Sequence, residues 1–190
     1  MRLSLHWALA ATLLACSAGS CQKDGPIASL PPATQEGKNT GGFLLNGQSW
    51  LPAKNPDLPA NSPVGATWVS HVYRGGKALQ IFLSRHPNPN DYSLLSFIFH
   101  DVRHAGTFEL NQDIDPLVIS GTRPPYAVYS LYGPGPNRAF YTGTTARGQI
   151  IITRFDTLAR VVSGTFEATL KAEGSPDSLT IAQGRFDAKF

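Results

Sequence analysis

The sequence predicts an all-β protein, an antiparallel β-sandwich or β-barrel of about ten strands. Its 190 residues contain 18 glycines and 15 prolines, and neither residue is tolerated inside a long helix. From Phe43 onward, apolar residues recur with a period of two or form short runs between turn signals, which is typical of strands. The periodicity does not choose between a sandwich and a barrel.

The bulk composition indicates a folded chain with a real apolar core. Hydrophobic residues make up 42% of the chain and charged residues only 15%, well below the quarter that is usual in soluble domains. An intrinsically disordered chain would have the opposite balance. The formal net charge is only +3, and the basic residues form no cluster. We therefore expect no nucleic-acid partner.

The first twenty residues have the order of an export signal. A short positive start, Met1-Arg2, precedes an apolar stretch at residues 3–15, and small residues follow at 17–20. The apolar stretch is shorter than the roughly 20 residues that a membrane-spanning helix needs. We expect residues 1–20 to be a signal peptide.

Two cysteines, Cys16 and Cys21, follow this apolar stretch, and no cysteine occurs later. Bacterial lipoprotein signals end in small residues directly before the cysteine that is acylated, and both positions fit. The run Gln22-Lys23-Asp24 after the second cysteine resembles the start of surface-displayed lipoproteins of the Bacteroidota type. We therefore favour lipidation at Cys21 and a lipid-anchored protein of the outer membrane, with Cys16 as the alternative site. The sequence does not decide whether the protein is displayed on the cell surface. A plain secreted protein with two incidental cysteines is the alternative to a lipoprotein.

Residues 21–41 are expected to form a flexible tether between the lipid and the domain. They contain three prolines and several Gly, Ser and Thr residues, with hardly any apolar periodicity, as in an extended linker. A single β-domain then covers residues 42–190.

Strand candidates follow one another through this domain. Asn46-Gly47, between two apolar runs, is the strongest short hairpin signal, because both turn residues need positive φ. Gly75-Gly76 predicts a second tight hairpin, and residues 52–65 and 111–125 are Pro-, Asn- and Asp-rich loops. The strand candidates are residues 43–45, 49–51, 66–74, 78–85, 92–102, 107–110, 126–132, 138–142, 149–155, 161–171 and 178–189.

A Gly-x-Phe-acid pattern occurs three times, at residues 106–109, 164–167 and 184–187. Because neighbouring residues of a strand face opposite sides, we expect the phenylalanine to point inward and the acid outward to solvent. In the last copy the apolar positions change parity at Gly184, which predicts a one-residue bulge there and pairing with the strand at 161–171. The recurrence is interpreted as a common way of starting a strand, not as a catalytic motif.

Segments near both ends of the chain carry a resemblance to a known group. They are LPPATQEGKNT at residues 30–40, ITRFD at 152–156, SGTFE at 163–167 and GRFD at 184–187. These segments resemble a family of uncharacterised Bacteroidota lipoproteins, a domain of unknown function, although the likeness is weak between residues 52 and 137. The resemblance implies an envelope address and a β-fold, but it implies no reaction.

Two groups of side chains are candidate metal ligands. His100 and His104 are four residues apart, but four residues along a strand span about 13 Å, whereas zinc–nitrogen bonds are about 2 Å long. The second group consists of loop residues whose side chains carry oxygen atoms. They lack the pattern of a calcium loop, and Asn and Asp are also the residues that turns require. They are Asn88, Asn90, Asp91, Asn111, Asp113 and Asp115. We therefore expect no metal site and no cofactor.

The remaining candidates concern catalysis and aromatic binding. The domain has no Gly-x-Ser-x-Gly elbow and no cysteine, so no catalytic residue is assigned. Tyr126 and Tyr132 share strand parity and Tyr129 does not, so the three cannot share one face. Exposed aromatic side chains would bind a sugar or a partner protein, although packing in a core is their commoner fate.

The sequence therefore favours a membrane-anchored envelope lipoprotein that is a binding or structural module, more readily than an enzyme. Its expected partners are the membrane, through the lipid anchor, and a glycan or an envelope protein. The alternative is an envelope hydrolase whose site is not visible in the sequence, for example one with paired carboxylates.

Overall fold

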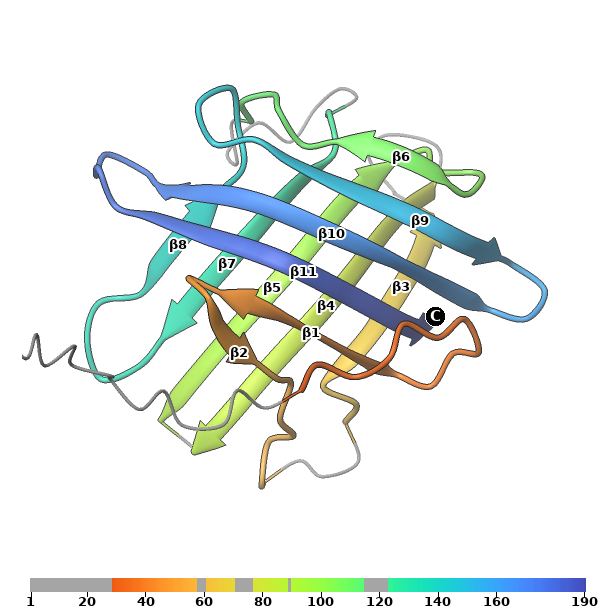
Figure 1. Cartoon of the computed structure of the whole chain (residues 1–190), viewed down its shortest axis with the longest axis horizontal. Helices are drawn as coiled ribbons and strands as arrows, with labels where there is room; N and C mark the ends of the chain where they lie inside the picture. Colours follow the sequence, from red (N-terminus) through yellow and green to blue (C-terminus); the bar gives the residue numbers. More distant parts are fainter. Residues whose placement is uncertain (1–28, 58–60, 71–76, 89, 115–122) are drawn as a thin grey trace, which may run out of the picture.

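The computed structural model describes residues 29–57, 61–70, 77–88, 90–114 and 123–190 (Figure 1). Within these residues the chain forms eleven β-strands and no helix, which confirms the all-β prediction. The strands are β1 (Thr40–Leu45), β2 (Gln48–Trp50), β3 (Val64–Ser70), β4 (Lys77–Asn88), β5 (Asp91–His100), β6 (Gly106–Glu109), β7 (Tyr126–Tyr132), β8 (Arg138–Tyr141), β9 (Gly148–Asp156), β10 (Val161–Ala172) and β11 (Ser178–Lys189).

The strands form one strongly curled antiparallel sheet, a half-barrel whose two layers cross each other (Figure 1). One layer has the strand order β8-β7-β5-β4-β3, and the other has the order β6-β9-β10-β11-β1-β2. Strand β10 belongs to both layers, because its residues 161–168 pair with β9 while Lys171 and Ala172 pair with β8. The architecture thus lies between the predicted sandwich and barrel.

Apolar side chains from both layers fill the space between them. Leu79 on β4 and Phe97 on β5 are fully buried, as the alternation along these strands requires. The ring of Phe97 lies 4.8 Å from that of Phe166 on β10, and the ring of Phe43 on β1 meets Tyr129 on β7 edge to face at 6.4 Å. The interior is a packed core shared by the two layers.

The first predicted hairpin is confirmed. Asn46 and Gly47 connect β1 to β2 with φ angles of 50° and 82°, the positive values that a two-residue hairpin turn requires. Strands β3 and β4 also pair as predicted. The Gly75-Gly76 turn itself lies outside the described residues.

Two copies of the Gly-x-Phe-acid pattern pair with each other across β10 and β11. Gly164 lies opposite Phe186, and Phe166 lies opposite Gly184, so each glycine accommodates the ring of the other strand. A Cβ atom on Gly184 would lie 2.3 Å from the Phe166 ring, and a Cβ atom on Gly164 would lie 2.1 Å from the Ile151 carbonyl oxygen. The recurrence is therefore a reciprocal packing device. The copy at 106–109 pairs with β9 instead.

The predicted bulge is present one residue before the expected position. Ala182 and Gln183 together oppose the single residue Glu167, and Gln183 has a φ of 53°. The extra residue brings Phe186 back to the inner face, where it is buried as predicted. Asp187 points to the opposite face, but the prediction that it is exposed to solvent is wrong, because its relative exposure is 1%.

The segment before β1 explains this burial. Residues 34–38 cross the outer face of β10 and β11 and hydrogen-bond to Asp187. This part of the chain differs from the flexible tether expected over 21–41, and β1 already begins at Thr40. The attachment depends on a carboxylate about 150 residues away, which no local sequence pattern reveals.

Candidate functional site

The candidate metal ligands do not come together. Within the described part of the chain, no group of three or more His, Cys, Asp or Glu side chains is placed to hold a metal ion. His104 Nδ1 lies 2.8 Å from the carbonyl oxygen of Ala105. The Asp113 carboxylate accepts hydrogen bonds from the Thr144 hydroxyl and amide, which lower its pKa. Asp115 lies outside the described residues, as do Cys16 and Cys21.

Asp187 is a carboxylate enclosed by protein hydrogen-bond donors. It accepts hydrogen bonds from the hydroxyls of Ser163 and Thr34, both at 2.6 Å. The amides of Glu36, Gly37 and Lys38 donate to it at 3.0, 2.7 and 3.1 Å. Burial alone would raise the pKa of Asp187, but the hydrogen bonds from Ser163, Thr34 and the backbone amides outweigh it and hold this pKa well below its usual range. A carboxylate so fully occupied anchors a segment and is not free to act on a substrate.

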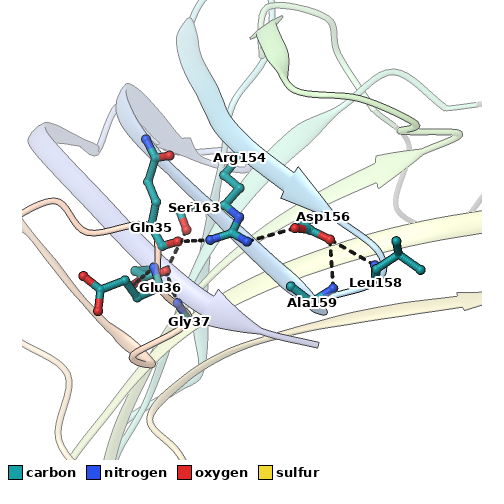
Figure 2. A network of polar contacts seen from close by, with 9 residues as sticks. Gln35, Glu36, Gly37, Arg154, Asp156, Leu158, Ala159 and Ser163 are labelled. Carbon is teal, nitrogen blue, oxygen red and sulfur yellow. Dashed lines mark hydrogen bonds and ion pairs between the residues drawn. The ribbon is translucent and has the colours of Figure 1, made fainter.

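A second contact fastens the same segment (Figure 2). The Arg154 guanidinium on β9 donates to the backbone carbonyl of Gln35 and, at 2.8 Å, to the Asp156 carboxylate. Asp156 also accepts the amides of Leu158 and Ala159 in the β9–β10 turn at 3.0 and 2.8 Å. The Ala159 amide and the Arg154 side chain lower the pKa of Asp156. These contacts and the Asp187 hydrogen bonds form the N-terminal latch, made of residues 34–38 and the groups that hold them.

The three tyrosines of β7 separate as their parity requires. Tyr129 is buried in the core, where burial raises its pKa, whereas Tyr132 lies on the outer face with 40% exposure. The ring of Tyr132 stacks on Tyr92 at 5.2 Å, and Tyr92 stacks on His86 at 4.1 Å. The parity argument is thus confirmed, and an aromatic row lies outside β4, β5 and β7.

A groove of about 530 Å³ lies at one end of this aromatic row, within the 300–1,000 Å³ common for ligand sites. It forms where edge strand β3 comes near the C-terminal end of β11. It is built from strands β3 and β4, from Tyr92 near the start of β5, from loop residues 54–55 and 61–63, and from Asn39 and Lys189 beside the latch. Its lining residues are Asn39, Lys54, Asn55, Asn61, Ser62, Pro63, Val64, Gly65, Ala66, Thr67, Phe82, Ser84, His86, Tyr92 and Lys189. We refer to this feature as the β3–β4 groove.

Aromatic rings line part of the groove. The Phe82 ring lies against Gly65 on the neighbouring strand, and a Cβ atom at Gly65 would come within 2.7 Å of it. This glycine therefore allows the ring to lie across β3. His86 and Tyr92 enter the groove as a stacked pair.

The polar lining of the groove is rich in donors. Lys54 and Lys189 are its charged members, and none of the described lining residues is Asp or Glu. The hydroxyl of Ser62 donates to the Val64 carbonyl at 2.6 Å, and that of Ser84 donates to the Pro63 carbonyl at 3.2 Å. Both hydroxyl protons are thus directed to the backbone and not to His86, so the described lining residues contain no serine–histidine pair.

The groove does not stand out in the sequence, because its residues come from distant segments. Asn39 belongs to the expected tether, the lining residues 54–55 and 61–63 belong to an expected loop, and Lys189 is the last residue but one. The one local signal is the expectation of exposed aromatic side chains, since Tyr132 stacks on the groove residue Tyr92.

Among the described residues no helix is long and apolar enough to cross a membrane. No protein family, no curated protein and no solved structure matches this chain.

Proposed function

We propose that this chain is a membrane-anchored lipoprotein of the cell envelope, lipidated at Cys21, and that it acts as a binding module through the β3–β4 groove. The address rests on the apolar start, the small residues before Cys21 and the Gln-Lys-Asp run after it. The observation that carries the binding role is the lining of the groove, in which the Phe82 ring and the stacked rings of His86 and Tyr92 lie beside polar side chains. An oligosaccharide unit is a ligand that suits such a lining.

Binding is favoured over hydrolysis by the chemistry of the groove. General acid–base catalysis needs a titratable group within hydrogen-bond reach of the reacting atom, and glycoside hydrolysis needs two carboxyl groups. The described lining residues include no carboxylate, and the hydroxyls of Ser62 and Ser84 donate to backbone carbonyls. His86 is stacked on Tyr92, a position that suits recognition of a ring.

The groove lies next to the latch, where the N-terminal segment meets the domain. Asn39 follows the latched residues 34–38 directly, and Lys189 lies two positions after Asp187. The Asn39 side-chain oxygen accepts the Lys189 amide at 2.8 Å. One rim of the groove is thus built on the segment that leads to the proposed lipid.

Lipidation is tested by metabolic labelling with radioactive palmitate in a bacterial host, followed by intact-mass measurement. We expect the wild-type chain and Cys16→Ala to incorporate label, and we expect Cys21→Ala to remain unlabelled. Label retained by Cys21→Ala and lost by Cys16→Ala would move the site to Cys16, and no label in any chain would refute the anchor.

The binding role is tested by filling the groove. Thr67 is an exposed β3 residue of the groove lining, so Thr67→Trp should occupy the site without disturbing the core. Thr107→Trp, at an exposed β6 position outside the groove lining, is the matched control. On an array of envelope and extracellular polysaccharides, the wild type and Thr107→Trp should bind the same glycans and Thr67→Trp should lose them. Equal binding by all three proteins, or no binding by any, would refute the proposal.

A further inference from the structure

We infer that the β3–β4 groove selects a sugar that carries a negatively charged group, a carboxylate or a phosphate, over its neutral counterpart. The inference rests on the proposed binding function and adds the chemical class of the ligand. Its first support is the charge of the groove. Lys54 and Lys189 are the two charged residues of the lining, and no carboxylate is present among the described lining residues. An anion bound in the groove would therefore have two lysines within the lining as partners for charge-assisted hydrogen bonds and would meet no carboxylate of the described lining.

The second support is the state of the two asparagines. The side-chain oxygen of Asn39 accepts the Lys189 amide, and that of Asn55 accepts the Asp57 amide, both at 2.8 Å. A carboxamide whose oxygen is engaged offers its NH₂ group to a ligand. The groove therefore presents donors to its occupant, and a carboxylate or a phosphate is rich in acceptors.

The third support is the apolar part of the lining. Phe82 and the stacked pair of His86 and Tyr92 line the same groove as the two lysines. A free inorganic anion would make no use of these rings, whereas an acidic sugar has both an apolar ring face and a charged substituent. Pockets that combine apolar walls with a few placed polar groups are typical of small organic ligands.

Other anionic or charged ligands fit less well. A divalent cation requires oxygen ligands, usually carboxylates, which the described lining residues lack. A nucleic acid requires a basic surface several charges wide, whereas the chain has a formal net charge of +3. An anionic lipid surface would not need a groove with aromatic walls, and it is one outcome that the test distinguishes.

The experiment is isothermal titration of the mature full-length protein in non-ionic detergent micelles. The carboxylate arm uses tetragalacturonate and its methyl ester, which share the same rings and differ in charge. The phosphate arm uses glucose 6-phosphate and glucose. We expect the charged member of at least one pair to bind about tenfold more tightly than the neutral member. Raising the NaCl concentration from ~50 to ~500 mM should reduce this difference, because the lysines are partly screened by salt.

Variants assign the selectivity to the lysines. Lys54→Gln and Lys189→Gln should each weaken the charged probe about fivefold or more and leave the neutral probe unchanged. Lys171→Gln, at an exposed position of β10 outside the groove lining, is the matched control and should bind like the wild type. Circular dichroism melts verify that the Lys189 variant is folded.

The outcomes separate the two levels of the proposal. Equal affinity for charged and neutral probes, both lost in Thr67→Trp, would overturn the anion inference and leave the binding function intact. Charge selectivity that survives in both lysine variants would also overturn it. Failure of all four probes, together with binding of the unlipidated Cys21→Ala chain to vesicles that contain phosphatidylglycerol, would overturn it in favour of a lipid surface.

Discussion

The Ser163 hydroxyl on β10 donates a 2.6 Å hydrogen bond to the carboxylate of Asp187, its direct cross-strand partner on β11. Neither residue is accessible to solvent, with exposures of 0% and 1%. A buried carboxylate is unfavourable unless it is fully hydrogen-bonded, and the remaining donors come from residues 34–38. The Asp187 carboxylate therefore holds the N-terminal segment on the sheet, and the segment in turn shields this carboxylate from solvent.

This relationship predicts that Asp187→Ala lowers the free energy of unfolding by about 2–4 kcal/mol, because the substitution leaves buried donors without an acceptor. Glu167→Ala is the matched control, since Glu167 is the acid of the paired Gly-x-Phe-acid copy and is exposed. Its loss should stay below about 0.5 kcal/mol. Urea denaturation of the two variants measures both values. Equal losses would show that the latch contributes nothing to stability.

The depressed pKa of Asp187 makes this contribution depend on pH. A group whose pKa is lower in the folded state stabilises the fold above its unfolded pKa, about 3.9 for an aspartate, and the stabilisation is lost as the pH falls toward the folded pKa. The difference in stability between the wild type and Asp187→Asn should therefore be constant between about pH 7 and 5 and shrink below about pH 4. Urea melts at a series of pH values measure it. A difference that grows on acidification would contradict the assignment of a depressed pKa.

Removal of the latched residues 34–38 should lower the thermal stability of the domain. A chain that begins at Asn39 lacks Thr34, Glu36, Gly37 and Lys38, and we expect its melting temperature to fall by about 4–8 °C. A chain that begins at Leu30 keeps the latch and serves as the control. Asp187→Ala should also lower the free energy of unfolding less in the shorter chain than in the longer one. In the shorter chain the donors of residues 34–38, which the substitution leaves without an acceptor, are already absent. Identical melting curves for the two chains would show that residues 34–38 are dispensable.

The contrast between Phe186 and Asp187 shows how far the sequence predicts this fold. Period-two alternation and turn residues predict the strands, the Asn46-Gly47 hairpin and the pairing of β10 with β11, because these depend on neighbours along the chain. Alternation also gives the direction in which Asp187 points. It does not reveal what covers that face, because the covering segment lies about 150 residues earlier. The groove was not predicted for the same reason, since Asn39, Lys54 and Lys189 line one groove only in the folded chain.

The reciprocal Gly–Phe pairs leave no space for a side chain at Gly184. A methyl group on Gly184 would lie 2.3 Å from the ring of Phe166, which is itself packed against Phe97 and Phe43. The ring has little space to move, so Gly184→Ala should cost about 1–3 kcal/mol, as overpacking does. Gly135→Ala is the control, because a Cβ atom at that position would have no neighbouring atom within 4 Å, and it should change stability by less than about 1 kcal/mol.

A double variant tests the cause of that loss. Phe166→Leu removes part of the ring that meets the new methyl group, so the loss in Gly184→Ala/Phe166→Leu should be smaller than the sum of the two single losses. For Gly164→Ala the loss of stability should not be reduced by Phe186→Leu. The new Cβ atom would lie 2.1 Å from the backbone oxygen of Ile151, and no side-chain substitution removes that atom. Urea melts of the four single and two double variants provide both cycles. Strict additivity at Gly184 would mean that its glycine serves the backbone of the neighbouring bulge and not the ring of Phe166.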